Sequence, residues 1–328
     1  MPVARAALHR FAAIQNLDIR ENAPLAAYTR FGIGGPAALL CDTASEGAFV
    51  EALHTAEELA VPSVVIGGGT NLVVSDAGFD GVVLRYTGAR IEQQGSGLQI
   101  ESGAVLQDAV DYSIQAGLRG LQTMTGIPGY IGAAVYGNAG AYGHSIQEIL
   151  EQVRFTDGTS VRAFSNEQCR FQYRDSIFKA HKEWVILSVQ LRFEAGDAVE
   201  LSRAANEIRV IRDAKYPPTM KCAGSIFKNL IFSALPVHVQ QEIPPKVVRE
   251  GKVPSAWFLE QVGAKGMRRG DIQVASYHAN LIYNDGAGTA ADLVAIIRDL
   301  KERVKQRFGF EVEEEVQYVG FEYAPAFT

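Results

Sequence analysis

The chain has few cysteines and histidines, the residues that most often hold structural metals. Its three cysteines, Cys41, Cys169 and Cys222, lie far apart and show no CxxC spacing. An odd number of widely separated cysteines argues against both a disulfide framework and a zinc site. The six histidines are equally dispersed. We therefore expect no bound metal and a cytoplasmic protein.

Long apolar runs and dense clusters of basic residues are also absent. The apolar runs are far shorter than the ~20 residues that a membrane-spanning helix requires. The segment Met1 to Asn22 lacks the continuous apolar core of a signal peptide. The net charge is −6, with no concentrated patch of lysine and arginine. The sequence thus predicts no membrane partner and no nucleic-acid partner.

What is present is an ordinary globular composition. The chain has 328 residues, of which 47% are hydrophobic and 21% charged. This length allows two or three domains with a substantial core. A monomer is the default expectation.

The most distinctive stretch runs from Pro62 to Asp76, PSVVIGGGTNLVVSD. The glycines Gly67, Gly68 and Gly69, followed by Thr70 and Asn71, separate two short apolar runs, which predicts a strand, a turn and a second strand. Glycine lets another group approach the backbone closely, and successive N–H groups in such a turn suit a phosphate or pyrophosphate. A strand after the glycines fits neither the dinucleotide fingerprint nor the P-loop, since both need a helix there. An ordinary turn between two strands is the alternative.

A second glycine-rich segment, Gly120 to Gly143, reads GLQTMTGIPGYIGAAVYGNAGAYG. It is too apolar for a flexible linker and too rich in glycine for a regular core element. Such a segment fits backbone packed tightly against a flat ligand. A buried irregular connection is the alternative.

The rest of the chain predicts a mixture of helices and strands. Residues 1–24 are expected to form a helix and then a loop, and Thr43 or Ser45 is expected to cap a helix that continues to Ala60. Further helices are predicted at 107–117, 198–214, 255–262 and 289–308, the last with an apolar stripe of Leu293, Ile296, Ile297, Leu300 and Val304. Strands are predicted at 38–41, 81–86, 91–93, 98–101, 152–155, 160–164, 184–193, 279–283 and 310–321.

Several motifs follow one another in a fixed order. They are GGGTN at 67–71, GIPG at 126–129, GNAGAYG at 137–143, YRDS at 173–176, GSIFKN at 224–229 and Glu315-Val316 near the C-terminus. This ordered set closely resembles the UDP-N-acetylenolpyruvoylglucosamine reductase family, the flavoenzymes of bacterial cell-wall precursor synthesis. The resemblance covers the chain from about Thr29 to Gly320.

The resemblance implies an α+β fold. It consists of an FAD-binding part of the vanillyl-alcohol-oxidase type, built from two α+β subdomains, and a smaller α+β substrate domain. The implied divisions are 1–86 with the returning strand 310–321, then 87–214, and finally 215–309. Some members insert an extra loop between Phe193 and Lys215, and its absence here indicates the short-loop subtype.

The resemblance also implies FAD as cofactor and NADPH as the hydride-donating substrate. The residues expected to bind the cofactor are Gly67, Gly68, Gly69, Thr70, Asn71, Gly126, Ile127, Gly129, Gly132, Asn138, Gly140 and Tyr173. Some relatives of the wider fold attach flavin covalently through a histidine in the glycine-rich turn. Since Thr70 follows the glycines and no histidine is near, we expect non-covalent FAD.

The implied reaction reduces the enolpyruvyl group of UDP-N-acetylglucosamine enolpyruvate, which gives UDP-N-acetylmuramate. Arg174 matches the family arginine at the substrate carboxylate, where a planar guanidinium stabilises developing negative charge. Ser225 matches the proton donor, and Glu315 matches a glutamate that assists electrostatically or holds a shared proton. The family commonly has proline before this glutamate, whereas Glu314 stands here. Taken without the family, these residues would be an ion-paired arginine, a turn serine and a solvated glutamate.

Three further residues match substrate-binding positions: Lys215, Asn229 and His278. Two alternative functions remain open at this stage. One is another FAD-dependent oxidase or dehydrogenase of the same fold, which would need the glycine turns but not the YRDS, GSIFKN and terminal-glutamate set. The other is a non-catalytic sugar-nucleotide-binding protein, against which the joint presence of Arg174, Ser225 and Glu315 speaks.

Overall fold

The chain folds into two compact units, each made of several separate stretches. A computed structural model describes residues 2–321. Unit 1 contains the chain up to Ala23, Ala37–Gly69 and Phe79–Pro217. Unit 2 contains Pro24–Pro36, Thr70–Gly78 and the chain from Pro218. The backbone therefore passes repeatedly from one unit to the other, and the three-part domain division expected from the sequence stays a prediction.

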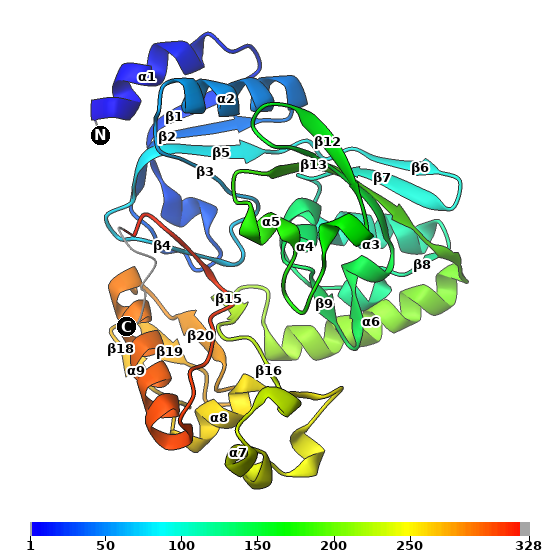
Figure 1. Cartoon of the computed structure of the whole chain (residues 1–328), viewed down its shortest axis with the longest axis vertical. Coiled ribbons are helices and arrows are strands. Elements are labelled where there is room, and N and C mark those ends of the chain that lie inside the picture. Colours follow the sequence, from blue (N-terminus) through cyan, green and yellow to red (C-terminus); the bar gives the residue numbers. More distant parts are fainter. Residues whose placement is uncertain (1, 322–328) are drawn as a thin grey trace. The chain divides into compact units, whose positions relative to one another are not determined.

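The first layer of unit 1 is a four-stranded sheet with the order β1-β2-β5-β3. Its strands are β1 (Asp18–Pro24), β2 (Pro36–Thr43), β3 (Ser63–Val65) and β5 (Phe79–Tyr86). Both β2 and β3 run parallel to β5. The helices α1 (Pro2–Ala12) and α2 (Glu46–Glu58) lie along one side of this sheet (Figure 1). The fully buried Phe11, Phe49 and Leu84 form the core between them.

Local sequence predicts the start of α2 in this layer but not the strand β1. Ser45 accepts a hydrogen bond from the Ala48 N–H and so caps α2, as predicted. The predicted loop before residue 24 is wrong, because Asp18–Pro24 forms β1. Six of its seven residues are exposed or half-buried, so this edge strand has no apolar alternation from which it could be predicted.

The second layer of unit 1 is an antiparallel five-stranded sheet with the order β12-β11-β13-β7-β6. Its strands are β6 (Ile91–Gln94), β7 (Gly97–Glu101), β11 (Leu150–Thr156), β12 (Val161–Ser165) and β13 (Val185–Arg192). The helices beside it are α3 (Leu106–Gln115), α4 (Ile131–Tyr136), α5 (Ile177–Ala180) and α6 (Ala198–Lys215). The ribbons β8 (Leu118–Arg119) with β14 (Glu194–Ala195) and β9 (Gly140–Ala141) with β10 (His144–Ser145) complete it. A buried core that includes Ile100, Val110 and Phe155 holds this layer together.

The glycine-rich segment 120–143 is more regular than predicted. It contains the short helix α4 and the strand β9. Gly132 lies inside α4, where a Cβ would come within 2.7 Å of the Ser102 Cβ. Here glycine is needed for close packing of a helix rather than for an irregular backbone.

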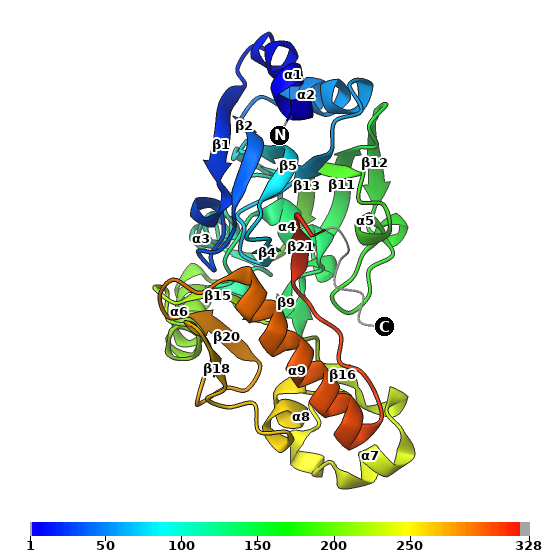
Figure 2. The same ribbon diagram turned by 90° about the vertical axis from the view of Figure 1, so that its left-hand side faces the viewer.

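Unit 2 is built on an antiparallel sheet with the order β15-β20-β19-β18. Its strands are β15 (Lys221–Ser225), β18 (Arg268–Arg269), β19 (Ile272–Val274) and β20 (Leu281–Asn284), and a ribbon pairs β16 (Leu230–Ile231) with β17 (Lys252–Val253). The helices are α7 (Val237–Glu242), α8 (Ser255–Gln261) and α9 (Ala290–Phe308), which runs past the sheet in Figure 2. The predicted stripe on α9 is buried along its whole length.

A parallel pair of short strands, β4 (Leu72–Val74) and β21 (Gln317–Val319), brings the C-terminal tail beside the segment that follows the glycine turn. The predicted strand 310–321 is therefore correct only for Gln317–Val319, near its C-terminal end. Phe31 and Val73 belong to the same buried core as the residues of α9. Unit 2 thus draws its core from three separate parts of the sequence.

The three cysteines are free and fully buried. Burial raises the pKa of the Cys41 thiol to about 12, with a smaller contribution from the neighbouring Asp42 charge. Burial likewise raises the pKa of Cys169 to about 12. Within residues 2–321, no group of three or more histidine, cysteine or acidic side chains could hold a metal ion. No helix of this range is long and apolar enough to span a membrane.

Candidate active site

The GGGTN turn connects β3 to β4 and presents main-chain donors. In the part of the chain that the structure describes, the N–H groups of Gly67, Gly68 and Gly69 have no hydrogen-bond acceptor. Gly69 is buried and has a φ of 64°, a conformation that glycine adopts without strain. Three successive unsatisfied donors beside glycine backbone suit an anionic phosphate.

A second turn, Gly126–Tyr130, packs against the first. A Cβ on Gly68 would lie 3.3 Å from the Gly129 Cα, and one on Gly67 would lie 3.6 Å from the Tyr130 ring. The group that approaches Gly68 is thus the neighbouring turn, whereas the sequence suggested the phosphate. Gly126 and Gly129 both have positive φ, 77° and 114°. The glycines therefore allow two turns of unit 1 to interlock.

Tyr130 fixes the contact between the two turns. Its ring covers Gly67 and Gly68, and its hydroxyl accepts a hydrogen bond of 3.1 Å from Arg85 Nη2. Tyr130 was not among the residues predicted from the sequence, although it directly follows the GIPG motif. Ile127, from that motif, packs against the second core of unit 1.

The GNAGAYG segment is held by a side-chain hydrogen bond and by close packing across a short ribbon. Asn138 is buried with a φ of 43°, and its Nδ2 donates to the Gln172 carbonyl at 2.8 Å. A Cβ on Gly140 would come within 2.3 Å of the His144 carbonyl oxygen, across the β9–β10 ribbon. The segment therefore has a defined shape that depends on glycine at position 140.

Arg174 lies in a tight turn of unit 1 and has a φ of 57°. Left-handed backbone is uncommon for a residue other than glycine and is often found at functional sites. Its Nη2 donates to the Gly140 carbonyl at 2.8 Å, and its guanidinium lies 5.4 Å from the centre of the Tyr173 ring. The structure thus brings Arg174 and Tyr173 to the GNAGAYG segment.

Lys215 is the last residue of α6. Its ammonium lies 5.0 Å from the ring centre of Tyr216. Arg212, one turn earlier, packs against Gly126, where a Cβ would be 3.2 Å from the Arg212 Nε. The end of α6 therefore places the Arg212 guanidinium against the GIPG turn of the same unit, with Lys215 beside Tyr216.

Ser225 ends β15 in unit 2 and is half-buried. The β15–β20 pairing shifts register between Cys222 and Ser225, and Gly224 has a φ of 77°. A glycine at positive φ and a shift in register together turn the strand locally. The Ser225 side chain therefore stands at a specific irregularity and not in a regular ladder.

The C-terminal tail lies next to Ser225. The Glu315 N–H donates to the Ile226 carbonyl at 2.7 Å, and Asn71 Nδ2 donates to the Glu315 carbonyl at 2.9 Å. The structure thus joins three sequence-predicted residues, Asn71, Ser225 and Glu315, in one local arrangement of unit 2. Thr70 is half-buried at the start of this part of the chain.

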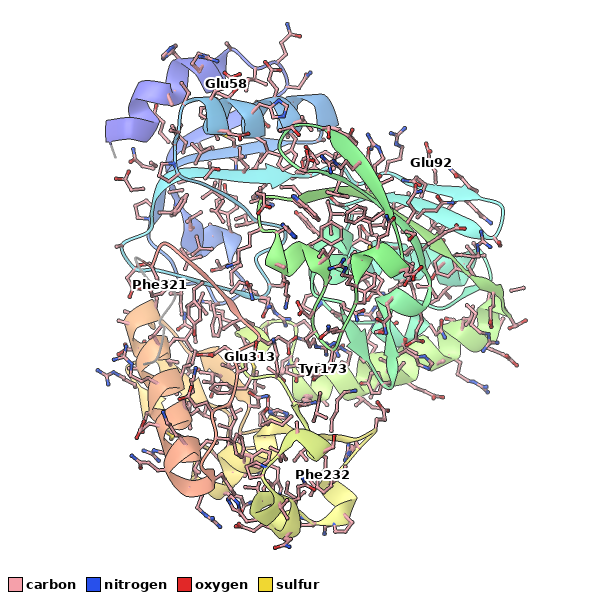
Figure 3. All side chains as sticks on the ribbon, in the orientation of Figure 1. Glu58, Glu92, Tyr173, Phe232, Glu313 and Phe321 are labelled. Carbon is pink, nitrogen blue, oxygen red and sulfur yellow. The ribbon has the colours of Figure 1, made fainter. Side chains whose placement is uncertain are left out.

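The glutamates around Glu315 have lysine partners. Glu314 forms an ion pair with Lys301, in which both side chains are only 12% exposed. Exposed pairs join Glu311 to Lys305 and Glu313, labelled in Figure 3, to Lys228. Of these neighbours, Glu314 is therefore a largely buried, paired glutamate, whereas Glu311 and Glu313 remain exposed.

Asn229 and His278 also belong to unit 2. Asn229 is exposed, and its Oδ1 accepts a 3.3 Å hydrogen bond from the Ser255 N–H. The His278 Nδ1 lies 3.2 Å from the Asn280 N–H, which donates to it. The proton of a neutral His278 must then be on Nε2.

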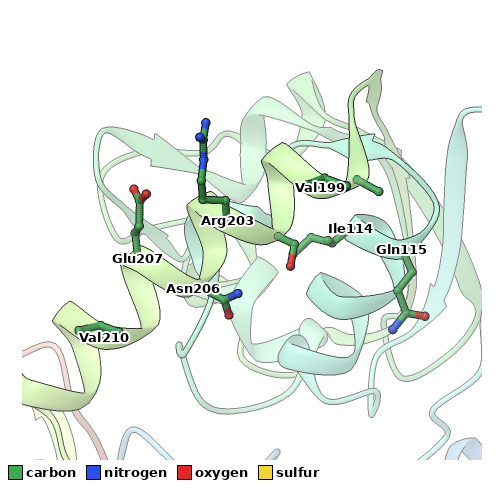
Figure 4. A pocket seen from close by; sticks show the side chains of 9 residues that line it. Ile114, Gln115, Val199, Arg203, Asn206, Glu207 and Val210 are labelled. Carbon is green, nitrogen blue, oxygen red and sulfur yellow. The ribbon is translucent and has the colours of Figure 1, made fainter.

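A shallow groove of about 730 Å³ lies elsewhere in unit 1, between α3 and α6. Val199, Arg203, Glu207 and Val210 line its α6 side (Figure 4). Among its described lining residues, none is a predicted site residue. The groove is therefore not part of the site described above.

Comparison with known protein families first shows which cofactor this class of protein binds. Residues 37–162 match the FAD binding domain family model, and this range contains the GGGTN, GIPG and GNAGAYG segments. The two interlocked glycine turns, with three unsatisfied N–H donors, fit the phosphates of such a cofactor. The protein is thus an FAD-dependent protein of α+β fold, as predicted.

Residues 216–319 match the family model of the UDP-N-acetylenolpyruvoylglucosamine reductase C-terminal domain. The chain is 58% identical to the UDP-N-acetylenolpyruvoylglucosamine reductase of Solibacter usitatus, over 95% of this chain and 100% of that protein. It is 36% identical to the enzyme of the same name from Rubrobacter xylanophilus, over 90% and 94%. The crystal structure of the Thermus caldophilus enzyme superposes with a TM-score of 0.71 at 28% identity, covering 92% of this chain and 98% of that one. The chain belongs to the UDP-N-acetylenolpyruvoylglucosamine reductase family, which confirms the resemblance found in the sequence.

Proposed function

We propose that this protein catalyses the NADPH-dependent, FAD-mediated reduction of UDP-N-acetylglucosamine enolpyruvate to UDP-N-acetylmuramate, a step of peptidoglycan precursor synthesis. The observation that carries the proposal is family membership along 95% of the chain, together with the presence of Arg174, Ser225 and Glu315. An oxidase of the same fold would not need these three residues.

The cofactor would be held by main-chain groups of unit 1 and by the residues that follow them. Gly67–Gly69, with Thr70 and Asn71, would bind the pyrophosphate. Gly126, Ile127, Gly129, Gly132, Asn138, Gly140 and Tyr173 would form the surface along the flavin. No histidine adjoins Thr70 in the sequence, so the cofactor would be held without a covalent bond.

The chemistry supplied by bound FAD is transfer of a hydride, taken from NADPH, to the terminal methylene carbon of the enolpyruvyl group. Negative charge then develops on the substrate carboxylate. Arg174 is the cation proposed to stabilise it, since a planar guanidinium can bind both carboxylate oxygens. The bond from Arg174 Nη2 to the Gly140 carbonyl orients this side chain in advance.

Protonation of the carbon next to the carboxylate completes the reaction. Ser225 is the proposed proton donor, and after its proton has passed to the substrate carbon the serine oxygen must take up another proton. Glu315 is proposed to assist electrostatically, and its main chain is bonded to Ile226, the residue after Ser225. The product gains one hydride and one proton, so the vinyl ether becomes a lactyl ether.

The remaining proposals concern substrate binding, domain division, oligomeric state and cellular location. Lys215 and Asn229 are proposed to bind the diphosphate and enolpyruvyl groups, and His278 is proposed as a further substrate contact. We also propose the three-part division 1–86 with 310–321, 87–214 and 215–309, a monomer, and a cytoplasmic location. The three free, buried cysteines support a reducing compartment.

The test is NADPH oxidation by the purified, flavin-loaded protein under anaerobic conditions, with and without UDP-N-acetylglucosamine enolpyruvate. We expect NADPH consumption equal to the amount of substrate added, with UDP-N-acetylmuramate identified by mass spectrometry. Flavin reduction by a hydroxy acid or alcohol, without turnover of the enolpyruvyl substrate, would favour the oxidase alternative. A colourless protein that binds the sugar nucleotide would favour the non-catalytic alternative.

A further inference from the structure

The three residues after Ser225 have a completely paired backbone. The Ile226 N–H donates to the Asn280 carbonyl at 3.1 Å, and the Ile226 carbonyl accepts from the Glu315 N–H at 2.7 Å. The Lys228 N–H donates to the Glu313 carbonyl at 2.9 Å. These bonds fix the segment on the side of β20 and on the side of the tail.

The residue in the middle, Phe227, is held by a side chain. Asn280 Oδ1 accepts from the Phe227 N–H at 2.9 Å, and Asn280 Nδ2 donates to the Phe227 carbonyl at 2.8 Å. Asn280 is only 3% exposed and Phe227 only 1%. The buried amide thus supplies the donor and the acceptor that a neighbouring strand would supply in a regular sheet.

An amide is the neutral group that meets this requirement. It offers one donor and one acceptor on the same short side chain. An alanine would leave a buried N–H and a buried carbonyl unpaired. An ionised aspartate would accept from the N–H but would place its second oxygen against the carbonyl.

We propose that Asn280 is a positioning residue for Ser225. The proton donor precedes the clamped segment directly, and Asn229, a proposed substrate ligand, follows it. By fixing Phe227, Asn280 holds both flanking side chains in the arrangement that the reaction needs. This inference rests on the proposed function, because it assigns Asn280 a role in the protonation step.

The first test separates the two half-reactions of the flavin-loaded protein in the Asn280→Ala variant. Flavin reduction by NADPH should stay within about twofold of wild type. Reoxidation by UDP-N-acetylglucosamine enolpyruvate should slow about 10- to 100-fold, the scale expected when a reacting group is misplaced. Because Asn229 also adjoins the clamped segment, KM should rise as well, but the fall in kcat should be larger than the rise in KM.

Asn284→Ala is the matched control. Asn284, the last residue of β20, is also a buried asparagine and is 4% exposed. Its side chain also binds main chain, donating to the Phe31 carbonyl at 3.1 Å and accepting from the Gly288 N–H at 2.9 Å. None of these groups adjoins Ser225. We expect a comparable loss of thermal stability but wild-type reoxidation.

The second variant, Asn280→Asp, has the same shape and guards against a simple loss of folding. When protonated, its carboxylic acid both donates and accepts, and so restores both bonds. Burial and the facing carbonyl should raise the pKa of this carboxyl. The ratio of its reoxidation rate to that of wild type should therefore rise as pH falls, whereas the ratio for Asn280→Ala should stay flat.

The titratable side chains around position 280 are His278 beside it, Lys228 on the clamped segment, and Glu313, Glu314 and Glu315 on the tail. Wild type carries all five, so taking the ratio at each pH removes their common effect. Comparison of the Asn280→Asp ratio with the Asn280→Ala ratio then separates the effect of the new carboxyl from an effect that arises only because packing is lost. What is left is the protonation of the introduced carboxyl.

The inference is overturned if folded Asn280→Ala is reoxidised as fast as wild type, or if Asn284→Ala is slowed equally. A pH-independent Asn280→Asp ratio would also overturn it. Failure of the proposed function looks different, because wild type itself would then not be reoxidised by the enolpyruvyl substrate.

Discussion

Ser225 is a half-buried serine at a break in the β15–β20 register, and its proposed role can be isolated by kinetics. Ser225→Ala should leave flavin reduction by NADPH near wild type, because that step needs no proton donor. Reoxidation by the enolpyruvyl substrate should slow by roughly 10² or more, the usual effect of losing a positioned acid. Stopped-flow measurement of flavin absorbance resolves the two steps.

Substrate binding should survive the Ser225→Ala change, since Arg174, Lys215 and Asn229 remain. The loss should therefore concern turnover and not affinity. If the variant were reoxidised as fast as wild type, Ser225 would be a turn residue and the assignment would be wrong.

Gly68 tests the interlocked turns. Gly68→Val should lower both flavin content and thermal stability, because its Cβ would already lie 3.3 Å from the Gly129 Cα and the γ-methyl groups need further room. Flavin content is measured by the absorbance ratio of the purified protein, and stability by thermal unfolding of the flavin-free form.

Gly47→Val is the control for Gly68. Gly47 is exposed in the first turn of α2, and a Cβ there would meet only Ser45 Oγ, at 3.9 Å. This variant should keep its flavin. Full flavin retention by Gly68→Val would show that the second turn can move away without cost.

At the scale of elements, the pair Lys301–Glu314 joins α9 to the tail that carries Glu315. Lys301 Nζ contacts both Glu314 oxygens, at 2.9 and 3.1 Å. Since both side chains are largely buried, Glu314→Gln removes a negative charge that contacts the buried Lys301 ammonium. We expect the free energy of unfolding to fall by about 2–4 kcal/mol, measured by urea denaturation.

Glu311→Gln provides the comparison on the same helix and tail. The Lys305–Glu311 pair is exposed, and its hydrogen bond holds the pKa of Glu311 below its usual value. Solvent screens such a pair, so the free energy of unfolding should stay close to wild type. Equal effects of the two substitutions would mean that burial of Glu314 is unimportant.

Helices and strands were predicted well where burial of one face gives the apolar residues a regular spacing. The α9 helix was predicted from its apolar stripe and begins and ends within a residue of the predicted range. The strand β1 was missed because its polar residues show no alternation. The strand predicted in the C-terminal tail was too long. Phe310–Val312 continues its apolar character but has no strand partner in the described chain.

Candidate site residues can be predicted from the sequence where a local motif carries them, but not where the fold creates the contact. Arg174, Ser225 and Glu315 each lie in a recognisable local motif. Asn280 does not, because its partner Phe227 is 53 residues away and is bound through its main chain. A contact between a side chain and a distant peptide group leaves no pattern in the sequence of the partner.

At the scale of the whole chain, the two units cannot be separated by one cut. Unit 2 draws Phe31, Ile33 and Val73 from the first part of the sequence into its core, and β21 pairs with β4. The fragment from Pro218 onward should therefore be poorly folded alone, with low helix content and no cooperative thermal transition by circular dichroism.

Supplying residues 1–217 as a second chain should restore folding to that fragment, since it returns the missing core residues and β4. A cooperative transition of the fragment alone would show that the three core residues and the β4–β21 pair are dispensable. The C-terminal family model, which matches one continuous range, would then describe an independent domain.

The buried cysteines have a practical consequence for spectroscopy. All three thiols are inaccessible, and burial keeps Cys41 and Cys169 protonated far above neutral pH. The native protein should therefore give almost no background with maleimide dyes. Val199 on α6 and Val237 on α7 are 78% and 70% exposed and belong to different units. Cysteines introduced at these two positions would carry a donor and an acceptor fluorophore, and energy transfer would then report how the separation of the units responds to NADPH or to the sugar nucleotide.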